Sequence, residues 1–164
     1  EIRLSLVGSE MCIRDSCYEV TLNVLRIVFE KLYEARIVLE GMVLKPNMVI
    51  DGKKLRKASV EEVAERTLSC LKASVPAAVP GIAFLSGGQS DIEATAHLNA
   101  INAMRGHSPW QLTFSYGRAL QSEALKIWAG KAENVAKAQE AFLHRAKMNS
   151  LAAQGQWSQE LENL

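Results

Sequence analysis

Apolar positions recur with a helical period through most of this chain, and short apolar runs separate the helical stretches. A helix is expected over residues 20–35, where the spacing places one apolar stripe along its length. The stripe consists of Val20, Val24, Leu25, Val28 and Leu32. Two capping boxes, Ser59 with Glu62 and Ser90 with Glu93, each predict the start of another helix.

The apolar runs between the helical stretches predict β-strands over residues 37–45, 81–85 and 111–116. Further helices are expected over residues 119–129 and 133–154. Strands that alternate with helices are typical of parallel β/α units, so the predicted fold class is α/β. Two architectures fit, a small open sheet or a piece of a (β/α)8 barrel. A whole barrel takes about 250 residues, whereas this chain has 164.

Both ends of the chain differ from its patterned middle. Residues 1–16 (EIRLSLVGSEMCIRDS) lack the basic start and long apolar centre of a signal peptide, and they continue no helical pattern. The string VGSEMCIRDS looks like translated sequencing-adapter read-through. We therefore expect residues 1–16 to be a non-native or disordered segment, with a flexible N-terminal arm as the alternative. Residues 17–154 are expected to fold, and the polar tail 155–164 is expected to fray.

Composition and charge narrow the function classes. The chain is 48% hydrophobic and 23% charged with a formal net charge of +1, which is typical of a globular protein. Its basic residues are interleaved with acids apart from one run at 53–57, so nothing indicates nucleic-acid binding. No apolar stretch is long enough to cross a membrane. The 3 cysteines and 3 histidines show no metal-ligand spacing, so we expect free thiols, no metal and a cytoplasmic location.

Lys45 is the first candidate for chemistry, since it ends an apolar run and is followed by Pro46. A lysine held among apolar neighbours can lose its proton and attack a carbonyl group. Alternation along the expected strand places Lys45 on an apolar face. The other members of that face are Ile37, Leu39, Gly41 and Val43. From spacing alone, a strand-terminal lysine that reaches solvent is the alternative.

A glycine loop after the second expected strand is a candidate for binding an anion. Ser86, Gly87 and Gly88 lie between that strand and a capped helix. Backbone N–H groups in such a loop, together with the Ser86 hydroxyl, can face a ligand, and the helix dipole favours negative charge there. The alternative is a tight turn that binds nothing.

The SYGR motif after the third expected strand is a second candidate. Arg118 presents a planar fork suited to phosphate, and Gly117 lets a ligand approach the backbone. Alternatively, Arg118 is a surface arginine that pairs with Glu123. Neighbouring parallel strands would bring Lys45, the Ser86 loop and Arg118 together at one edge. A nucleophilic amine beside a phosphate cradle indicates a phosphorylated carbonyl substrate.

Four stretches carry a resemblance to a known family. They are LEGMVLKPNM (Leu39–Met48), VPAAVPGIAFLSGGQS (Val75–Ser90), HLNAINA (His97–Ala103) and PWQLTFSYGRALQ (Pro109–Gln121). In order and spacing, residues 17–154 resemble the C-terminal half of class I fructose-bisphosphate aldolases. The resemblance implies a partial (β/α)8 TIM barrel, its last three β/α units with C-terminal helices. It also implies a cytosolic, homotetrameric glycolytic lyase without metal or cofactor. Such enzymes cleave fructose 1,6-bisphosphate to dihydroxyacetone phosphate and glyceraldehyde 3-phosphate.

The resemblance also implies residue roles toward this small-molecule sugar phosphate. Lys45 matches the lysine that forms an imine (Schiff base) with the substrate ketone. The positions that match phosphate-binding residues are Ser86, Gly87, Gly117 and Arg118. Ser115 lies close by and is included in the expected phosphate site.

The resemblance leaves parts of the family pattern without a match. The family's N-terminal half, with roughly its first five strands and the residues that handle protons, has no counterpart here, and neither does its C-terminal tyrosine. We therefore expect a fragment that lacks turnover by itself. The alternative is a catalytically silent partial barrel that acts only as a phosphate-binding or association module. A Schiff-base aldolase for another sugar is a third interpretation, which the SGG and SYGR motifs disfavour.

Overall fold

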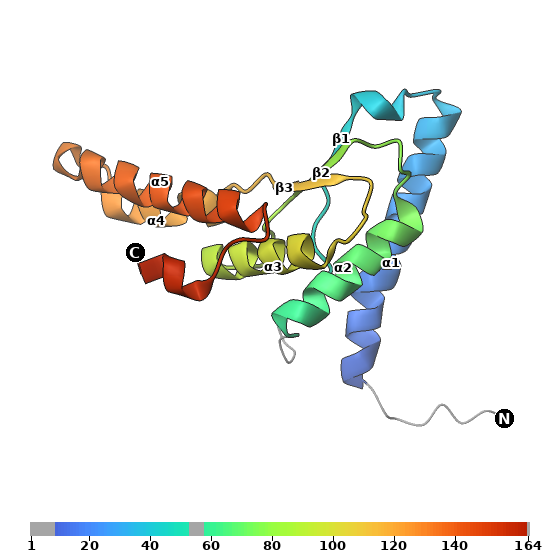
Figure 1. Cartoon of the computed structure of the whole chain (residues 1–164), viewed down its shortest axis with the longest axis horizontal. Helices are drawn as coiled ribbons and strands as arrows, with labels where there is room; N and C mark the ends of the chain where they lie inside the picture. Colours follow the sequence, from blue (N-terminus) through green and yellow to red (C-terminus); the bar gives the residue numbers. More distant parts are fainter. Residues whose placement is uncertain (1–8, 53–57, 164) are drawn as a thin grey trace.

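Three parallel strands alternate with helices along the chain (Figure 1). The structure is a computed structural model that describes residues 9–52 and 58–163. The α-helices are α1 (Ser9–Glu34), α2 (Val60–Ser74), α3 (Asp91–Met104), α4 (Arg118–Trp128) and α5 (Val135–Ala152). Three short 3-10 helices are η1 (Leu39–Gly41), η2 (Ala132–Asn134) and η3 (Gln159–Asn163). The strands are β1 (Val43–Leu44), β2 (Gly81–Phe84) and β3 (Gln111–Phe114).

The sheet has the strand order β1-β2-β3, and all pairs are parallel. Its register joins Leu44 to Ile82 and Ile82 to Leu112, and all three side chains are buried. This face packs against α2 and α3, which lie side by side along one side of the sheet (Figure 1). The α/β class expected from the sequence is confirmed.

Both predicted capping boxes are present. The Ser59 hydroxyl accepts from the Glu62 N–H group at the start of α2, and the Ser90 hydroxyl accepts from the Glu93 N–H group at the start of α3. Each glutamate in turn accepts from the N–H group of its serine. The caps are local in sequence, so these helix starts were predicted correctly.

The strand expected over residues 37–45 is wrong in extent. The chain instead forms the 3-10 turn η1, closed by hydrogen bonds from Gly41 N to Val38 O and from Met42 N to Leu39 O, both 3.2 Å long. Only the two residues of β1 then pair with β2. The apolar composition of the run suggested a strand, but Glu40 and Gly41 interrupt it. The third strand is also shorter than expected, because it ends at Phe114 rather than residue 116.

The last described residues differ from the frayed tail that we expected. Trp157 donates from its backbone N–H group to the Asn99 Oδ1 atom on α3, at 2.9 Å, and its ring packs against the core. Glu162 of η3 is bound by Arg145 of α5. Residues 155–163 therefore pack through a few long-range contacts that composition alone does not reveal.

At the other end, α1 begins at Ser9, within the segment 1–16. That residues 1–16 are a non-native segment stays a prediction. The basic run at residues 53–57 lies outside the described residues. None of the described helices is long and apolar enough to span a membrane.

Candidate active site

The carboxyl ends of the three strands meet at one edge of the sheet. Backbone hydrogen bonds continue past the strands there, from Leu85 N to Pro46 O at 2.9 Å and from Ser115 N to Phe84 O at 2.8 Å. Pairing at these positions makes the Lys45 segment, the glycine loop and the SYGR motif neighbours along that edge. Ligands bind at this edge of parallel α/β sheets.

Lys45 follows β1 directly, and its side chain is exposed. Alternation along the chain places it on the same face as Val43, which is 58% exposed, while Leu44 between them is buried. The apolar face expected around Lys45 is therefore wrong. Ile37 and Leu39 do not share a strand with Lys45, because their segment contains the 3-10 turn η1. Among the described residues, Lys45 lies at an open face rather than in an apolar enclosure.

The glycine loop lies tightly against the chain that follows Lys45. A Cβ atom placed on Gly87 would lie 3.2 Å from Asn47 Oδ1, and one placed on Gly88 would lie 3.1 Å from Ile50 Cδ1. Gly88 also has a φ of +82°, which side chains disfavour. Within the described part of the chain, no acceptor takes the N–H groups of Ser86, Gly87 and Gly88. The loop thus has backbone donors available for an anion.

The N-terminus of α4 is also open to a ligand. Its N-cap residue is Gly117, which supplies no side-chain cap, and its first turn carries no acidic residue. A Cβ atom on Gly117 would meet nothing within 4 Å. The positive end of the helix dipole and the first N–H groups of α4 are therefore left unneutralised by side chains.

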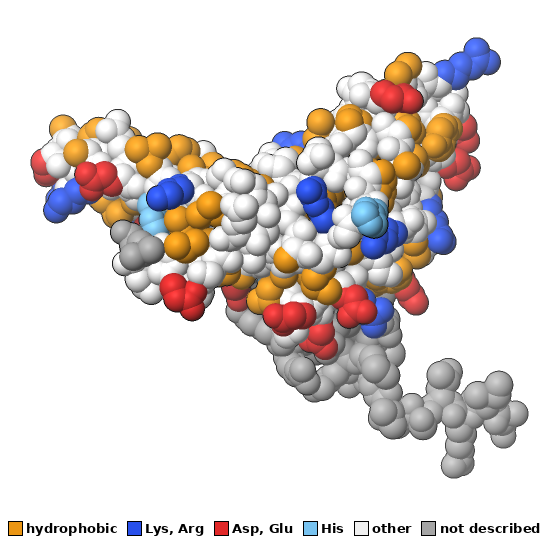
Figure 2. All heavy atoms as spheres, in the orientation of Figure 1, with side chains coloured by type: hydrophobic (Ala, Val, Ile, Leu, Met, Phe, Trp, Pro, Cys, Tyr) orange, Lys and Arg blue, Asp and Glu red, His pale blue; other side chains and the backbone are white. Residues whose placement is uncertain are grey.

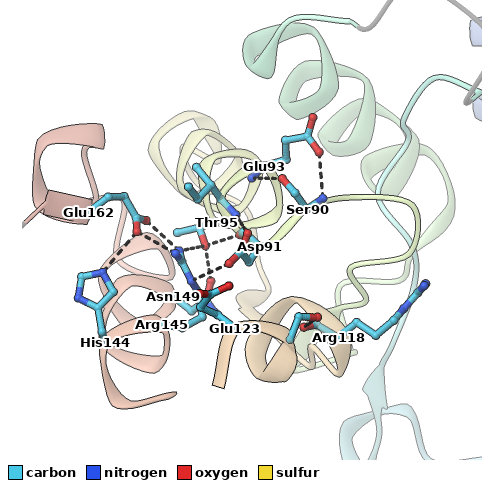
Figure 3. Close-up of polar contacts among 12 residues, drawn as sticks. Ser90, Asp91, Glu93, Thr95, Arg118, Glu123, His144, Arg145, Asn149 and Glu162 are labelled. Atoms are coloured by element: carbon cyan, nitrogen blue, oxygen red, sulfur yellow. Dashed lines mark hydrogen bonds and ion pairs between the residues drawn. The ribbon is translucent and has the colours of Figure 1, made fainter. Parts of the chain in front are cut away.

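Arg118 begins α4, and its side chain is exposed. The alternative pairing with Glu123 is not formed, because Glu123 binds Lys126 at 3.4 Å instead. Across residues 9–52 and 58–163, no ion pair is seen for Arg118. Figure 3 shows its side chain extending away from the polar cluster formed around Arg145.

One polar hollow joins the glycine loop to the start of α4. It has a volume of about 390 Å³, and its lining includes Gly88, Gln89 and Arg118, together with the acids Asp91 and Glu123. The structure thus brings Arg118 and the end of the glycine loop to one hollow. The lining of this hollow does not include Lys45, nor the other expected phosphate-binding residues. These are Ser86, Gly87, Ser115 and Gly117.

Comparisons with known proteins show the family to which the chain belongs. The family model described as fructose-bisphosphate aldolase class-I matches residues 9–164. This chain belongs to the class I fructose-bisphosphate aldolase family. The family is a group of glycolytic lyases, and its name agrees with the resemblance seen in the sequence.

Named aldolases are similar to this chain over most of its length. A probable fructose-bisphosphate aldolase class 1 from Xanthomonas axonopodis pv. citri is 56% identical over 145 residues, which are 87% of this chain and 43% of that protein. The cytoplasmic isozyme of fructose-bisphosphate aldolase from Spinacia oleracea is 52% identical over 143 residues, or 87% and 40% of the two chains.

A solved structure agrees as well. Plasmodium falciparum fructose-bisphosphate aldolase, in complex with TRAP and a small-molecule inhibitor, superposes with a TM-score of 0.85 at 51% identity. The match covers 88% of this chain and 42% of that one. The chain therefore spans about two fifths of the length of the aldolases that it matches.

The sequence patterns did not mark two polar residues near the site of this aldolase-family chain as candidates. Asn47 lies close to the glycine loop, where it would crowd a Cβ atom on Gly87, and Gln89 Oε1 lies 2.6 Å from the ring Nδ1 atom of the buried His97. Gln89 and His97 are eight positions apart, a spacing that carries no motif. Asn47 follows Lys45 in the quoted motif, but its contact with Gly87 depends on strand pairing that only the structure provides.

Proposed function

We propose that this chain is part of a class I fructose-bisphosphate aldolase, in which Lys45 forms the imine with the substrate ketone. Ser86, Gly87, Ser115, Gly117 and Arg118 bind a substrate phosphate in this proposal. The three β/α units are the last three of a (β/α)8 barrel, and the parent enzyme is a cytoplasmic homotetramer that needs no metal or other cofactor. Family membership and the match to a solved aldolase support the proposal.

One observation carries the proposal. Three adjacent parallel strands are followed at the same edge by a primary amine, by a loop with available N–H groups and by a helix start without a side-chain cap. Arg118 lies at that helix start, and its side chain is exposed and forms no ion pair within the described residues. Backbone N–H groups and an arginine fork are donors that suit phosphate. The amine is a nucleophile for a carbonyl carbon. The phosphate donors and the amine together suit a ketose phosphate better than either group does alone.

The chemistry follows from the amine. The Lys45 nitrogen adds to the ketone carbon, the carbonyl oxygen leaves as water, and a protonated imine results. The imine withdraws electrons from the neighbouring carbon, so that the next C–C bond can break with its electron pair moving toward nitrogen. Phosphate contacts from the segments that follow β2 and β3 would hold the ketone carbon near Lys45 at the end of β1. This orientation is worth several orders of magnitude in rate in well-aligned systems.

We expect the chain by itself to form the imine without completing turnover. General acid–base groups contribute about 10²–10⁴-fold each, and Lys45 is exposed in this chain. A catalytically silent partial barrel, which binds phosphate or associates with other chains, is the second candidate. The exposed face of β1 favours that candidate.

Trapping the imine distinguishes the two candidates. The chain is incubated with dihydroxyacetone phosphate and sodium borohydride, which delivers hydride to the imine carbon and leaves a stable secondary amine. Peptide mass mapping should place the adduct on Lys45. In Lys45→Arg the charge is kept while the nucleophile is lost, and the adduct should disappear. Lys72→Arg, at an exposed position of α2, is the matched control and should keep it.

Two results would count against the imine proposal. One is an adduct spread evenly over exposed lysines, and the other is an adduct unaffected by Lys45→Arg. Phosphate binding without any adduct would favour the silent module.

A further inference from the structure

The carboxylate of Glu162 is held at an unusually complete site for a residue so near the end of the chain. Arg145 donates from Nη1 to Oε1 and from Nη2 to Oε2, both at 2.8 Å. The Trp157 ring N–H group also donates to Oε1 at 2.8 Å, and the His144 Nε2 atom lies 3.4 Å from Oε2. The side chain of Glu162 is only 6% exposed. A bidentate arginine–carboxylate pair of this kind is strongly directional.

Arg145 continues the contact from Glu162 to the start of α3. Its Nη1 atom donates to the Thr95 hydroxyl at 3.2 Å, and its Nε atom lies 3.8 Å from Asp91 Oδ2. Thr95 Oγ1 lies 2.7 Å from Asn149 Oδ1 and 2.8 Å from the Asp91 carbonyl oxygen. Figure 3 shows these groups converging from α3, α5 and the C-terminal segment.

The contact with α3 matters because α3 carries the glycine loop. Asp91 is the first residue of α3, and its N-cap Ser90 follows the loop residues 86–89 directly. On the other side, the loop lies so close to Asn47 and Ile50 that an added Cβ atom would be crowded, at 3.1–3.2 Å from their side chains. The loop is therefore confined between the chain after β1 and the N-terminus of α3. A shift of α3 would move the free N–H groups of the loop.

We propose that Arg145 and Glu162 act as positioning residues, through which the C-terminal segment holds the glycine loop in its ligand-binding geometry. The role of the loop in binding phosphate rests on the proposed function. The link from Glu162 through Arg145 to α3 and the loop does not depend on it. Binding constellations must be held within about 0.5 Å of their productive geometry. Removing one charge of a buried pair leaves the other uncompensated, so losing the Glu162 charge should disturb the contacts of Arg145 with α3.

The test replaces Glu162 by Gln, which keeps its shape and removes its charge. Glu160→Gln is the matched control, because Glu160 lies in the same 3-10 helix and is exposed. Amide hydrogen exchange is followed at residues 86–93, and the dissociation constant for dihydroxyacetone phosphate is measured at low protein concentration. Glu162→Gln should speed exchange at 86–93 by about tenfold, as expected for a local opening. It should also weaken binding several-fold, whereas Glu160→Gln should change neither.

A purely structural role predicts a different result. Glu162→Gln would then lower thermal stability while exchange at residues 86–93 and phosphate affinity stayed as in the unaltered chain, and this would overturn the proposal. Should Glu162→Gln not fold, Trp157→Phe removes the ring N–H donor to Glu162 together with part of the ring, leaves the charges of Arg145 and Glu162 in place, and should shift exchange at 86–93 in the same direction by less. No shift with Trp157→Phe would then count against the link. An unaltered chain that binds no phosphate contradicts the proposed function alone, since exchange still reports on the link.

Discussion

The two faces of the sheet differ in how far their side chains are buried. On the covered face, Ile82 and Phe84 are 0% exposed and lie against the helices. On the open face, Val43 is 58% exposed, and Lys45 and Thr113 are exposed as well. Figure 2 shows hydrophobic side chains that also reach the surface along the outer helices. Burial on the covered face therefore contributes most of the apolar packing of the sheet, whereas the residues proposed for the chemistry lie at the carboxyl ends of the strands and on the more exposed face.

The largest effect should come from the covered face. Phe84→Ala removes a fully buried ring at the centre of the sheet and should lower the free energy of unfolding by about 3–5 kcal/mol. Thr113→Ala, on the open face of β3, should change it by less than about 0.5 kcal/mol. Urea denaturation followed by circular dichroism measures both. Equal losses of unfolding free energy in the two variants would mean that the open face is packed in solution, and would contradict the difference between the two faces.

The covered face was also the part that the sequence predicted well. The capping boxes at Ser59 and Ser90 and the apolar strand at 81–85 depend on neighbours within a few positions, so local pattern is sufficient to find them. The order of the three strands also follows from their alternation with helices. Recognition of the family came from contiguous motifs and is confirmed by the match over residues 9–164.

The parts that were missed depend on contacts between distant positions. The run 37–45 is apolar enough for a strand, but the 3-10 turn at Leu39–Gly41 limits pairing to two residues. The packing of the C-terminal segment depends on the hydrogen bonds of Arg145 with Glu162, 17 positions away, and of Trp157 with Asn99, 58 positions away. The roles assigned to Lys45 and to the phosphate residues stay predictions.

Arg118 should show the next largest effect, on ligand binding rather than on folding. Hydrogen bonds to charged groups contribute about 1.5–3 kcal/mol, so Arg118→Gln should raise the dissociation constant for dihydroxyacetone phosphate by about ten- to a hundredfold. Isothermal titration calorimetry measures this change. Lys126→Gln is the control, because Lys126 lines the same hollow but is paired with Glu123. Equal losses for both variants would indicate attraction by general positive charge and no specific arginine contact.

A smaller effect should follow from the open face itself. An uncovered sheet with free edges is prone to associate with other chains, so we expect the 164-residue chain to aggregate as its concentration rises. Val43→Ser reduces the apolar area of that face and should weaken association by about 1 kcal/mol, or about fivefold. Sedimentation velocity over a concentration series measures this. A soluble monomer with a sharp, cooperative thermal transition at every concentration would contradict the expectation.

The smallest effect concerns pH and the C-terminal segment. Burial raises the pKa of the Glu162 carboxyl, but hydrogen bonds from Arg145, Trp157 and His144, together with the positive charge of Arg145, outweigh burial and hold the pKa below the usual value. The folded chain therefore binds the Glu162 proton more weakly than the unfolded chain does. Stability from this carboxylate is complete above the usual glutamate pKa of 4.5 and declines as the pH falls through the lowered folded value.

Glu162→Gln should accordingly be less stable than the unaltered chain at neutral pH, and the gap should narrow as the pH falls below 4.5. Thermal unfolding at several pH values measures the gap. Glu160→Gln is the control, because Glu160 is fully exposed and its interactions are screened by solvent; its gap should be small at every pH. A gap for Glu162→Gln that stays constant from neutral to acidic pH would mean that the shape of the side chain, rather than its charge, stabilises the contact. In that case the C-terminal segment would be held by packing of Trp157 and η3, and acid would leave the position of α3 unchanged.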